Sequence, residues 1–210
     1  RHDNNPSTGS LKDLAGSAVA SVLKESGITQ YVVASTGNFG VALGRYLGAA
    51  GISLYVFIPR DSSPLHDAEL GCFGQKVFRV AGDYTAAKEL ATEFASHYDL
   101  CLSPGQYDPI RIEAKRTMLF DWVSRLDAVP TVYVQALSGG MGPLGIYKGC
   151  KELACTSLRA RPPRFYLIQT DTCCPMAQAW TAAKATDFAP GWERRYPIIH
   201  SPPTGIATLA

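Results

Sequence analysis

The chain has 210 residues, of which 46% are apolar and 18% charged, and its formal net charge is +2. This composition is typical of a globular protein and excludes a disordered chain, while the small charge and the lack of a basic run argue against nucleic-acid binding. No apolar stretch approaches the length of a membrane span and nothing near the N-terminus resembles a signal peptide, so we expect no membrane partner.

The six cysteines and four histidines are scattered along the chain. No C-x-x-C pair occurs and the histidines add no ligand spacing, so we expect no metal site. Scattered cysteines in a chain of this length indicate reduced thiols and therefore a cytoplasmic protein. The chain begins at Arg1 and ends at Ala210 within an apolar stretch, so we expect it to be a fragment of a longer protein.

The segment Asn5–Asp13 joins a Gly/Ser/Pro-rich loop to an amphipathic helix. We expect Ser10 to cap this helix, with Asp13 three positions further on. Lys12 then lies in the first helical turn, where the positive end of the helix dipole disfavours a cation. A lysine shifted toward its neutral form is a nucleophile that can form a Schiff base with a carbonyl. On position alone, an ordinary exposed lysine remains the more frequent case.

Six short runs rich in Val, Ile, Tyr and Phe are expected to form strands. They are Gln30–Ser35, Ser53–Ile58, Lys76–Val80, Asp99–Leu102, Thr131–Ala136 and Phe165–Thr170. Their almost continuous hydrophobicity is typical of buried parallel strands. Because helical patterns lie between them, the sequence predicts an α/β protein with right-handed crossovers.

Four of these strands fall between Thr29 and Pro104, which is enough for a small open sheet. The turn-rich segment Ser103–Asp108 is expected to return the chain to the rest of the fold. We therefore predict an inner domain of residues 29–107 inserted into an outer domain of residues 1–28 and 108–210, giving two open, mostly parallel sheets flanked by helices. Two helical stripes are expected to face the core: Leu11, Leu14, Ala18 and Val22, and Ala114, Met118 and Trp122.

The loop Ser35–Gly40 directly follows a predicted strand and opens a helix. A strand, a glycine-rich turn and a helix in this order aim backbone N–H groups at an anion, with the helix dipole behind them. The hydroxyls of Ser35 and Thr36 and the amide of Asn38 add side-chain donors at the same place. Taken alone, the loop is equally well explained as a tight turn that needs its two glycines for backbone reasons.

The second glycine-rich loop, Ser138–Gly145, follows the strand at residues 131–136 and contains four glycines within seven positions. The missing side chains allow the backbone to wrap a phosphate group. A flexible connector fits poorly, because connections in α/β proteins are normally short and specific. The loop therefore predicts a phosphate site.

The same loop contains a literal G-x-G-x-x-G from Gly140 to Gly145, and Asp171 follows the last predicted strand. This pattern leaves open a nicotinamide-dinucleotide-binding oxidoreductase domain. The spacing to Asp171 is longer than usual, however, and Pro143 lies where the helix should begin to pack. This interpretation also gives Lys12 no role, so it stays a distant alternative.

Three motifs in order, N-P-S-T-G-S-L-K-D at Asn5–Asp13, S-T-G-N-F-G at Ser35–Gly40 and the glycine-rich Ser138–Gly145, resemble the fold type II pyridoxal-phosphate enzymes. Within that family the chain is most similar to threonine synthase and its relatives, including cysteate synthase. The similarity runs through nearly the whole chain, including Pro163–Met176 and Pro202–Thr208. Family members are much longer and begin well before the lysine loop.

The resemblance implies that pyridoxal phosphate is the cofactor and that Lys12 holds it as a Schiff base and then moves protons. Asn38 would donate a hydrogen bond to the cofactor's phenolic oxygen. The contact to the pyridine nitrogen is expected beyond Ala210. The remaining implied roles lie in the two loops: Ser35, Thr36, Asn38 and Phe39 for the substrate α-carboxylate, and the backbone N–H groups of Ser138, Gly139, Gly140, Met141 and Gly142 for the cofactor phosphate.

The implied activity is that of a lyase, which eliminates phosphate or a similar leaving group from an O-activated amino acid. Water or another nucleophile would then add at the β carbon. The sequence of the second loop is more similar to that of β-replacement relatives. A cysteate or cysteine synthase-like enzyme therefore stays an alternative, as does a threonine or serine ammonia-lyase. The implied partners are a small amino-acid substrate and a second copy in a homodimer. A binding protein without turnover is a further class, against which the intact Lys12 argues.

Overall fold

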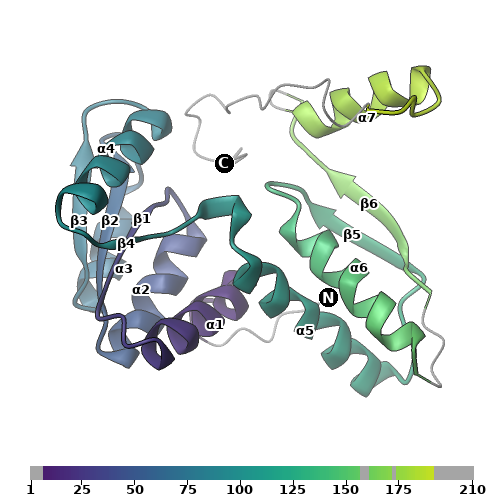
Figure 1. Ribbon diagram of the computed structural model, residues 1–210, viewed down its shortest axis with the longest axis horizontal. Helices are drawn as coiled ribbons and strands as arrows, with labels where there is room; N and C mark the ends of the chain where they lie inside the picture. Colours follow the sequence, from purple (N-terminus) through teal and green to yellow (C-terminus); the bar gives the residue numbers. More distant parts are fainter. Residues whose placement is uncertain (1–6, 157–160, 172–173, 192–210) are drawn as a thin grey trace.

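The computed structural model describes residues 7–156, 161–171 and 174–191. Its strands are β1 (Gln30–Ala34), β2 (Ser53–Pro59), β3 (Lys76–Val80), β4 (Cys101–Leu102), β5 (Val132–Ala136) and β6 (Arg164–Ile168). Its helices are α1 (Lys12–Glu25), α2 (Asn38–Ala50), α3 (Pro64–Cys72), α4 (Tyr84–His97), α5 (Pro109–Leu126), α6 (Met141–Ala154) and α7 (Pro175–Ala185), with a short 3-10 helix, η1 (Gly105–Tyr107). Figure 1 shows β1 to β4 grouped on one side of the molecule and β5 and β6 on the other.

The strands form two parallel sheets, one with the order β3-β2-β1-β4 and one made of β5 and β6. All strand pairs among the described residues are parallel. The predicted α/β class and the six predicted strands are confirmed, with ends that differ by at most two residues. Differences of two residues occur at the end of β6 and at the start of β4, where Asp99 has a φ of +51° in the left-handed region and delays the extended backbone to Cys101.

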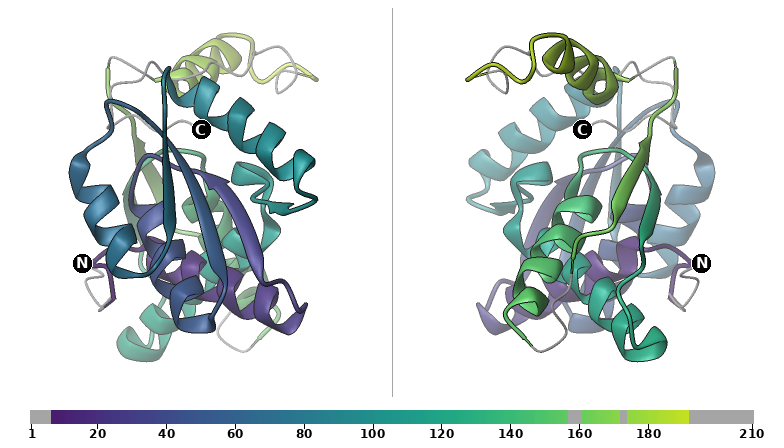
Figure 2. Two further views of the ribbon diagram at one scale, coloured as in Figure 1. Left: turned by 90° about the vertical axis from the view of Figure 1, so that its left-hand side faces the viewer. Right: turned by 90° about the vertical axis from the view of Figure 1, so that its right-hand side faces the viewer.

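The four-stranded sheet carries helices on both faces, since alternate residues of a strand point to opposite sides. Val32 and Phe57 pack with Ala87 and Ala91 of α4 on one face. The other face buries the neighbouring strand positions against α1, α2 and α3. Figure 2 shows α3 and α4 on opposite sides of this sheet.

Helix α1 presents a different face to the core from the one that its sequence stripe predicted. Val22 was expected inside but is 39% exposed. The reason is the close contact of α1 with α2, where a Cβ at Gly16 would lie only 2.9 Å from the backbone carbon of Ala42. This small-residue contact sets the rotation of the helix. The apolar side chains that α1 buries are those of Ala15, Val19, Ala20 and Leu23.

The two-stranded sheet packs against α5 and α6. Met118 and Leu119 form a buried cluster there with Tyr133 of β5 and Ile146 of α6, and Trp122 packs against that cluster. The predicted core stripe of α5 is therefore confirmed. Helices α5 and α6 are in close contact at Gly145, where a Cβ would lie 2.9 Å from the backbone nitrogen of Arg116.

The predicted division into residues 1–28 with 108–210 and residues 29–107 stays a prediction. Helix α1 packs both against α2, within the core of the four-stranded sheet, and against α5 of the other group. In the described part of the chain, no helix combines the length and the apolar character needed to span a bilayer. For the site, the important feature is that β1, β4 and β5 all end at one cavity.

Candidate active site

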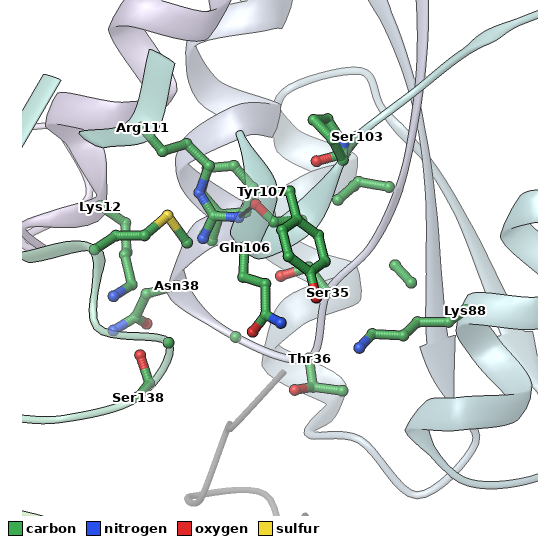
Figure 3. A pocket seen from close by; sticks show the side chains of 18 of the residues that line it. Lys12, Ser35, Thr36, Asn38, Lys88, Ser103, Gln106, Tyr107, Arg111 and Ser138 are labelled. Atoms are coloured by element: carbon green, nitrogen blue, oxygen red, sulfur yellow. Dashed lines mark hydrogen bonds between the residues drawn. The ribbon is translucent and has the colours of Figure 1, made fainter. Parts of the chain in front are cut away.

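A cavity of about 340 Å³ lies at the carboxyl ends of β1, β4 and β5. This is the usual place for ligands in parallel α/β sheets. Its lining includes every site residue that the sequence singled out, although the two loops lie about a hundred positions apart in the chain. Figure 3 shows Lys12, Asn38 and Ser138 on one side of the cavity. The placement is thus as expected, while the roles of these residues stay predictions.

Lys12 is the first residue of α1, and the loop before it is held by Asp13. The Asp13 carboxylate is 2% exposed and accepts hydrogen bonds from the Thr8 backbone N–H at 2.9 Å and from the Thr8 hydroxyl at 2.7 Å. The expectation that Ser10 caps the helix is wrong, because Leu11 occupies the N-cap position of α1. The Ser10 hydroxyl accepts only the backbone N–H of Lys12, at 3.2 Å. Residue Gly9, with φ +70°, makes this turn possible.

Lys12 lies in a setting that favours a neutral amine. Burial lowers the pKa of the Lys12 ammonium, and the positive charge of Arg111 lowers that pKa further. The sequence predicted the direction from the helix dipole, whereas these causes come from long-range packing. An amine of this kind can attack a carbonyl carbon and can accept a proton.

The first loop combines hydroxyl groups with the N-terminus of α2. The Ser35 hydroxyl accepts a hydrogen bond from the Gly40 backbone N–H at 2.9 Å, which leaves its own hydrogen free to donate to a ligand. Thr36 and Asn38 also line the cavity. The backbone N–H groups of Asn38 and Phe39 lie in the first helical turn and lack intrahelical partners. This set of donors suits a carboxylate.

The second loop presents bare backbone at the N-terminus of α6. Gly140 occupies the N-cap position with φ +77°, and no side chain caps the helix. The N–H groups of Met141 and Gly142 have no partner within the helix. A Cβ on Gly142 would lie 2.7 Å from Nε2 of Gln135, so a larger residue there would have to displace the Gln135 side chain. Unencumbered N–H groups at a helix N-terminus fit a phosphate group.

Arg111 is a cavity residue that the sequence did not single out. Its guanidinium lies 3.8 Å from the ring centre of Phe39, and Nη1 donates to the Gly105 carbonyl at 2.5 Å. Its Nε is buried and, within the described residues, has no hydrogen-bond partner. The side chain is therefore held in place with one donor still unused.

Lys115, one helical turn after Arg111, was also missed. It is 2% exposed, and burial lowers its pKa to about 7, with the charges of Lys12 and Arg111 acting in the same direction and Asp108 opposing them. In the sequence, Lys115 directly follows Ala114, a member of the stripe that was expected to face the core.

The charged side chains of the cavity are all basic. Lys12, Lys88, Arg111 and Lys115 line it, and the described lining residues include no aspartate or glutamate. A buried lysine with a lowered pKa, a helix terminus of bare backbone and a hydroxyl-rich helix terminus meet in this α/β fold. Together they define an enzyme-like site for a phosphate-bearing carbonyl cofactor and an anionic substrate.

Comparison with known proteins identifies the family. The model of the family described as "Pyridoxal-phosphate dependent enzyme" matches residues 1–208, so the chain belongs to that family, and pyridoxal phosphate is its cofactor. The bare N–H groups at the start of α6 and the buried amine of Lys12 fit the cofactor's phosphate and carbonyl. The family match leaves no place for the nicotinamide-dinucleotide alternative.

The curated relatives bear out the resemblance that the motifs indicated. Threonine synthase of Mycobacterium leprae is 27% identical over 170 residues, which cover 80% of this chain and 47% of that protein. Cysteate synthase of Methanoregula boonei is 29% identical over 188 residues, covering 88% and 44%. The chain thus spans about half the length of the curated relatives it matches.

Solved structures agree on the fold. The processed form of threonine deaminase isoform 2 from Solanum lycopersicum superposes with a TM-score of 0.74 at 15% identity, over 87% of this chain and 49% of that one.

Proposed function

We propose that this protein is a pyridoxal-phosphate-dependent lyase related to threonine synthase. It eliminates phosphate, or a similar leaving group, from an O-activated amino acid and adds water or another nucleophile at the β carbon. The observation that carries this proposal is the lining of the cavity, which has four basic side chains and, among its described residues, no carboxylate. Such a cavity suits a ligand set with a cofactor phosphate, a substrate carboxylate and a second anionic group.

The cofactor end of the cavity is formed by Lys12 and the start of α6. Met141 and Gly142 would bind the cofactor phosphate through their backbone N–H groups, and Lys12 would attach covalently to the carbonyl carbon. When bound, pyridoxal phosphate supplies an electron sink for negative charge at the substrate's α carbon. The Lys12 amine, whose pKa burial lowers, would take the α-proton and later return it.

The substrate end would use the loop before α2 and Arg111. The Ser35 and Thr36 hydroxyls and the first N–H groups of α2 would orient the α-carboxylate. Arg111 would bind the leaving group, because its guanidinium is fixed over Phe39 and retains an unused buried donor within the described structure. The fork of N–H groups on arginine matches the oxygens of a phosphate.

The experiment that tests the cofactor role uses the full-length protein loaded with pyridoxal phosphate. A visible absorption spectrum is recorded, the protein is reduced with borohydride, and the labelled peptide is mapped. We expect the label on Lys12, and Lys12→Ala should lose both the label and roughly 10³-fold or more of the turnover. Lys24→Ala, which alters an exposed lysine of the same helix, is the control. A label on another lysine would contradict the assignment.

The reaction is tested with three amino acids. Release of phosphate from O-phosphohomoserine or O-phosphoserine, with formation of a new amino acid, would support the proposal. Release of ammonia from threonine alone would favour the ammonia-lyase alternative. A protein that carries the Lys12 label but turns over none of the three is not the proposed lyase.

We further propose a cytoplasmic homodimer. The five cysteines in the described part of the chain are free thiols, which suits a reducing compartment. The family resemblance supports the dimer, and the molar mass of the full-length protein in solution tests it.

A further inference from the structure

Lys115 is a cavity residue that the proposed function does not use. It lines the cavity at 2% exposure, and among the described residues it is the only basic side chain that is buried. No ion pair of the described residues includes it. A charge costs free energy where water cannot reach it and no acid pairs with it, so burial favours the neutral amine.

The charged neighbours of Lys115 come from two helices. Asp108, the N-cap of α5, is followed by Arg111 after three residues and by Lys115 after four more, so the three share one face of the helix. From α1 the neighbour is Lys12. Burial lowers the pKa of Lys115 most, the charges of Lys12 and Arg111 lower it further, and Asp108 raises it, which leaves it at about 7.

These neighbours also show where Lys115 lies along the cavity. In the proposed function Lys12 meets the substrate's α carbon and Arg111 binds the leaving group, so the β carbon lies between them. Lys115 is close enough to both residues for their charges to act on its amine. Lys88 is placed differently, since Figure 3 shows it on the side of Thr36, with Lys12 on the opposite side.

The proposed reaction needs a second proton acceptor. Removal of the α-proton turns the Lys12 amine into an ammonium, and the leaving group departs with the electron pair of its bond to the β carbon. When the second reactant adds, its attacking atom bonds to the β carbon and Lys12 returns its proton to the α carbon. The attacking atom must lose a proton in the same step, and an ammonium cannot accept it.

Few groups of the cavity can take that proton. The described lining residues include no carboxylate and no histidine. The arginine keeps its charge, and burial raises the pKa of Tyr84, whose hydroxyl donates to the Ala34 carbonyl at 3.0 Å. A general base works best when its pKa lies near the working pH, and the Lys115 amine meets this condition.

We propose that Lys115 is the base that takes the proton of the second reactant while that reactant adds to the β carbon. The inference rests on the proposed function and narrows it. The attacking atom of the second reactant carries a proton, as in water, an alcohol or a thiol. The Lys115 ammonium then gives its proton to the departed leaving group or to solvent, so the net reaction replaces the leaving group by the nucleophile.

The protonation of Lys115 is measured without turnover, on the cofactor-free full-length protein, by NMR of lysine side chains labelled with ¹³C at Cε. The Lys115 signal is assigned by its absence from Lys115→Met. It should titrate at about pH 7. A signal that titrates in the ordinary lysine range, about pH 10, overturns the inference.

The role is tested by turnover of O-phosphoserine with a thiol, on the full-length protein loaded with pyridoxal phosphate. Lys115→Met should still exchange the α-proton with solvent and release phosphate, because these steps use Lys12. Addition of the thiol should fall about 10²-fold or more, and a 2-oxo acid and ammonia should accumulate instead. Lys115→Arg, which keeps the charge but cannot accept a proton, should show the same loss. Lys151→Met, at an exposed position of α6, is the control.

Several results would overturn the inference alone. They are normal thiol addition in Lys115→Met, recovery in Lys115→Arg, a loss that appears in Lys88→Met instead, and a wild type that adds sulfite but no water, alcohol or thiol. An equal loss of α-proton exchange and thiol addition in Lys115→Met also overturns it, because Lys115 would then act on Lys12. A wild type without the borohydride label on Lys12, or one that carries the label and adds no nucleophile, defeats the proposed function itself.

Discussion

The N-termini of α2 and α6 both present hydrogen-bond donors to the cavity, α2 with the help of side chains and α6 with backbone alone. Both helices follow a parallel strand and open on the same cavity. At α2, side chains contribute, and the Ser35 hydroxyl accepts the Gly40 N–H while Thr36 and Asn38 face the cavity. At α6, no side chain caps the helix, and Gly140 turns the backbone with a left-handed φ.

This difference matches the two kinds of ligand that we propose. Fixed backbone N–H groups suit a phosphate that stays bound through many turnovers, while hydroxyls that can rotate suit a substrate that comes and goes. It also predicts opposite sensitivities. Ligand binding at the α6 terminus should weaken when a side chain is enlarged. Ligand binding at the α2 terminus should weaken when a side chain is shortened.

Among variants of the two helix termini, the largest effect is expected from Gly142→Ala. Its Cβ would displace the carboxamide of Gln135 from the wall of the cavity, or push the start of α6 outward. Overpacking of this kind costs about 1–3 kcal/mol, so the affinity for pyridoxal phosphate should fall about ten- to a hundredfold. The dissociation constant is measured by absorption titration of the cofactor.

Two further variants test the steric explanation of that loss. Gln135→Ala combined with Gly142→Ala should recover part of the affinity, because the shorter side chain leaves room for the Cβ. Gly71→Ala adds a methyl group on α3 where no atom lies within 4 Å, and it should leave cofactor affinity unchanged. If Gly142→Ala binds the cofactor normally, the α6 terminus is not the phosphate site.

The contrast between the loops also explains what the sequence could predict. Both loops could be predicted as ligand sites because glycines and hydroxyl residues gather directly after strands. The carboxyl ends of parallel strands meet at one edge of a sheet. Arg111, Lys115 and Lys88 come from the sides of helices, and only the packing of α4 and α5 brings them to the cavity. A local pattern cannot show which helix face meets a distant loop.

The rotation of α1 illustrates the same limit. The spacing of Leu14, Ala18 and Val22 is as helical as that of Ala15, Val19 and Leu23, and sequence periodicity alone favoured the first set. In the structure the second set is buried, because the close contact of Gly16 with the Ala42 backbone fixes the rotation of the helix. Fold class depends on patterns repeated along the whole chain, whereas helix rotation depends on single contacts.

A second prediction concerns the charge of Lys115, which lines the cavity on which the N-termini of α2 and α6 open. Its pKa falls from 10.5 to about 7 in the folded protein. Between these values the unfolded chain binds more protons than the folded one, so this group makes the free energy of unfolding rise with pH, by up to roughly 1.4 kcal/mol per pH unit. Lys115→Met should remove about that slope between pH 7 and 10 and should be more stable than wild type near pH 6.

Urea unfolding of the cofactor-free protein at several pH values measures this slope. Lys24→Met, at an exposed position of α1, is the control and should keep the wild-type slope. An unchanged slope in Lys115→Met would mean that the amine keeps its charge in the folded protein. The cavity would then contain more positive charge than the comparison of the two termini assumes.

The smallest effect is expected from Ser35→Ala, which removes atoms from the α2 terminus. Loss of the hydroxyl that accepts the Gly40 N–H should cost about 1 kcal/mol of stability, as for other helix caps. Ser63→Ala, which removes the cap of α3 at an exposed position, should cost a similar amount. Only Ser35→Ala should also raise the KM for the amino-acid substrate several-fold, because only that hydroxyl faces the cavity. Cofactor affinity should stay unchanged in both variants. If Ser35→Ala instead weakened cofactor binding and left KM alone, the two helix termini would not divide the ligands between them as we propose.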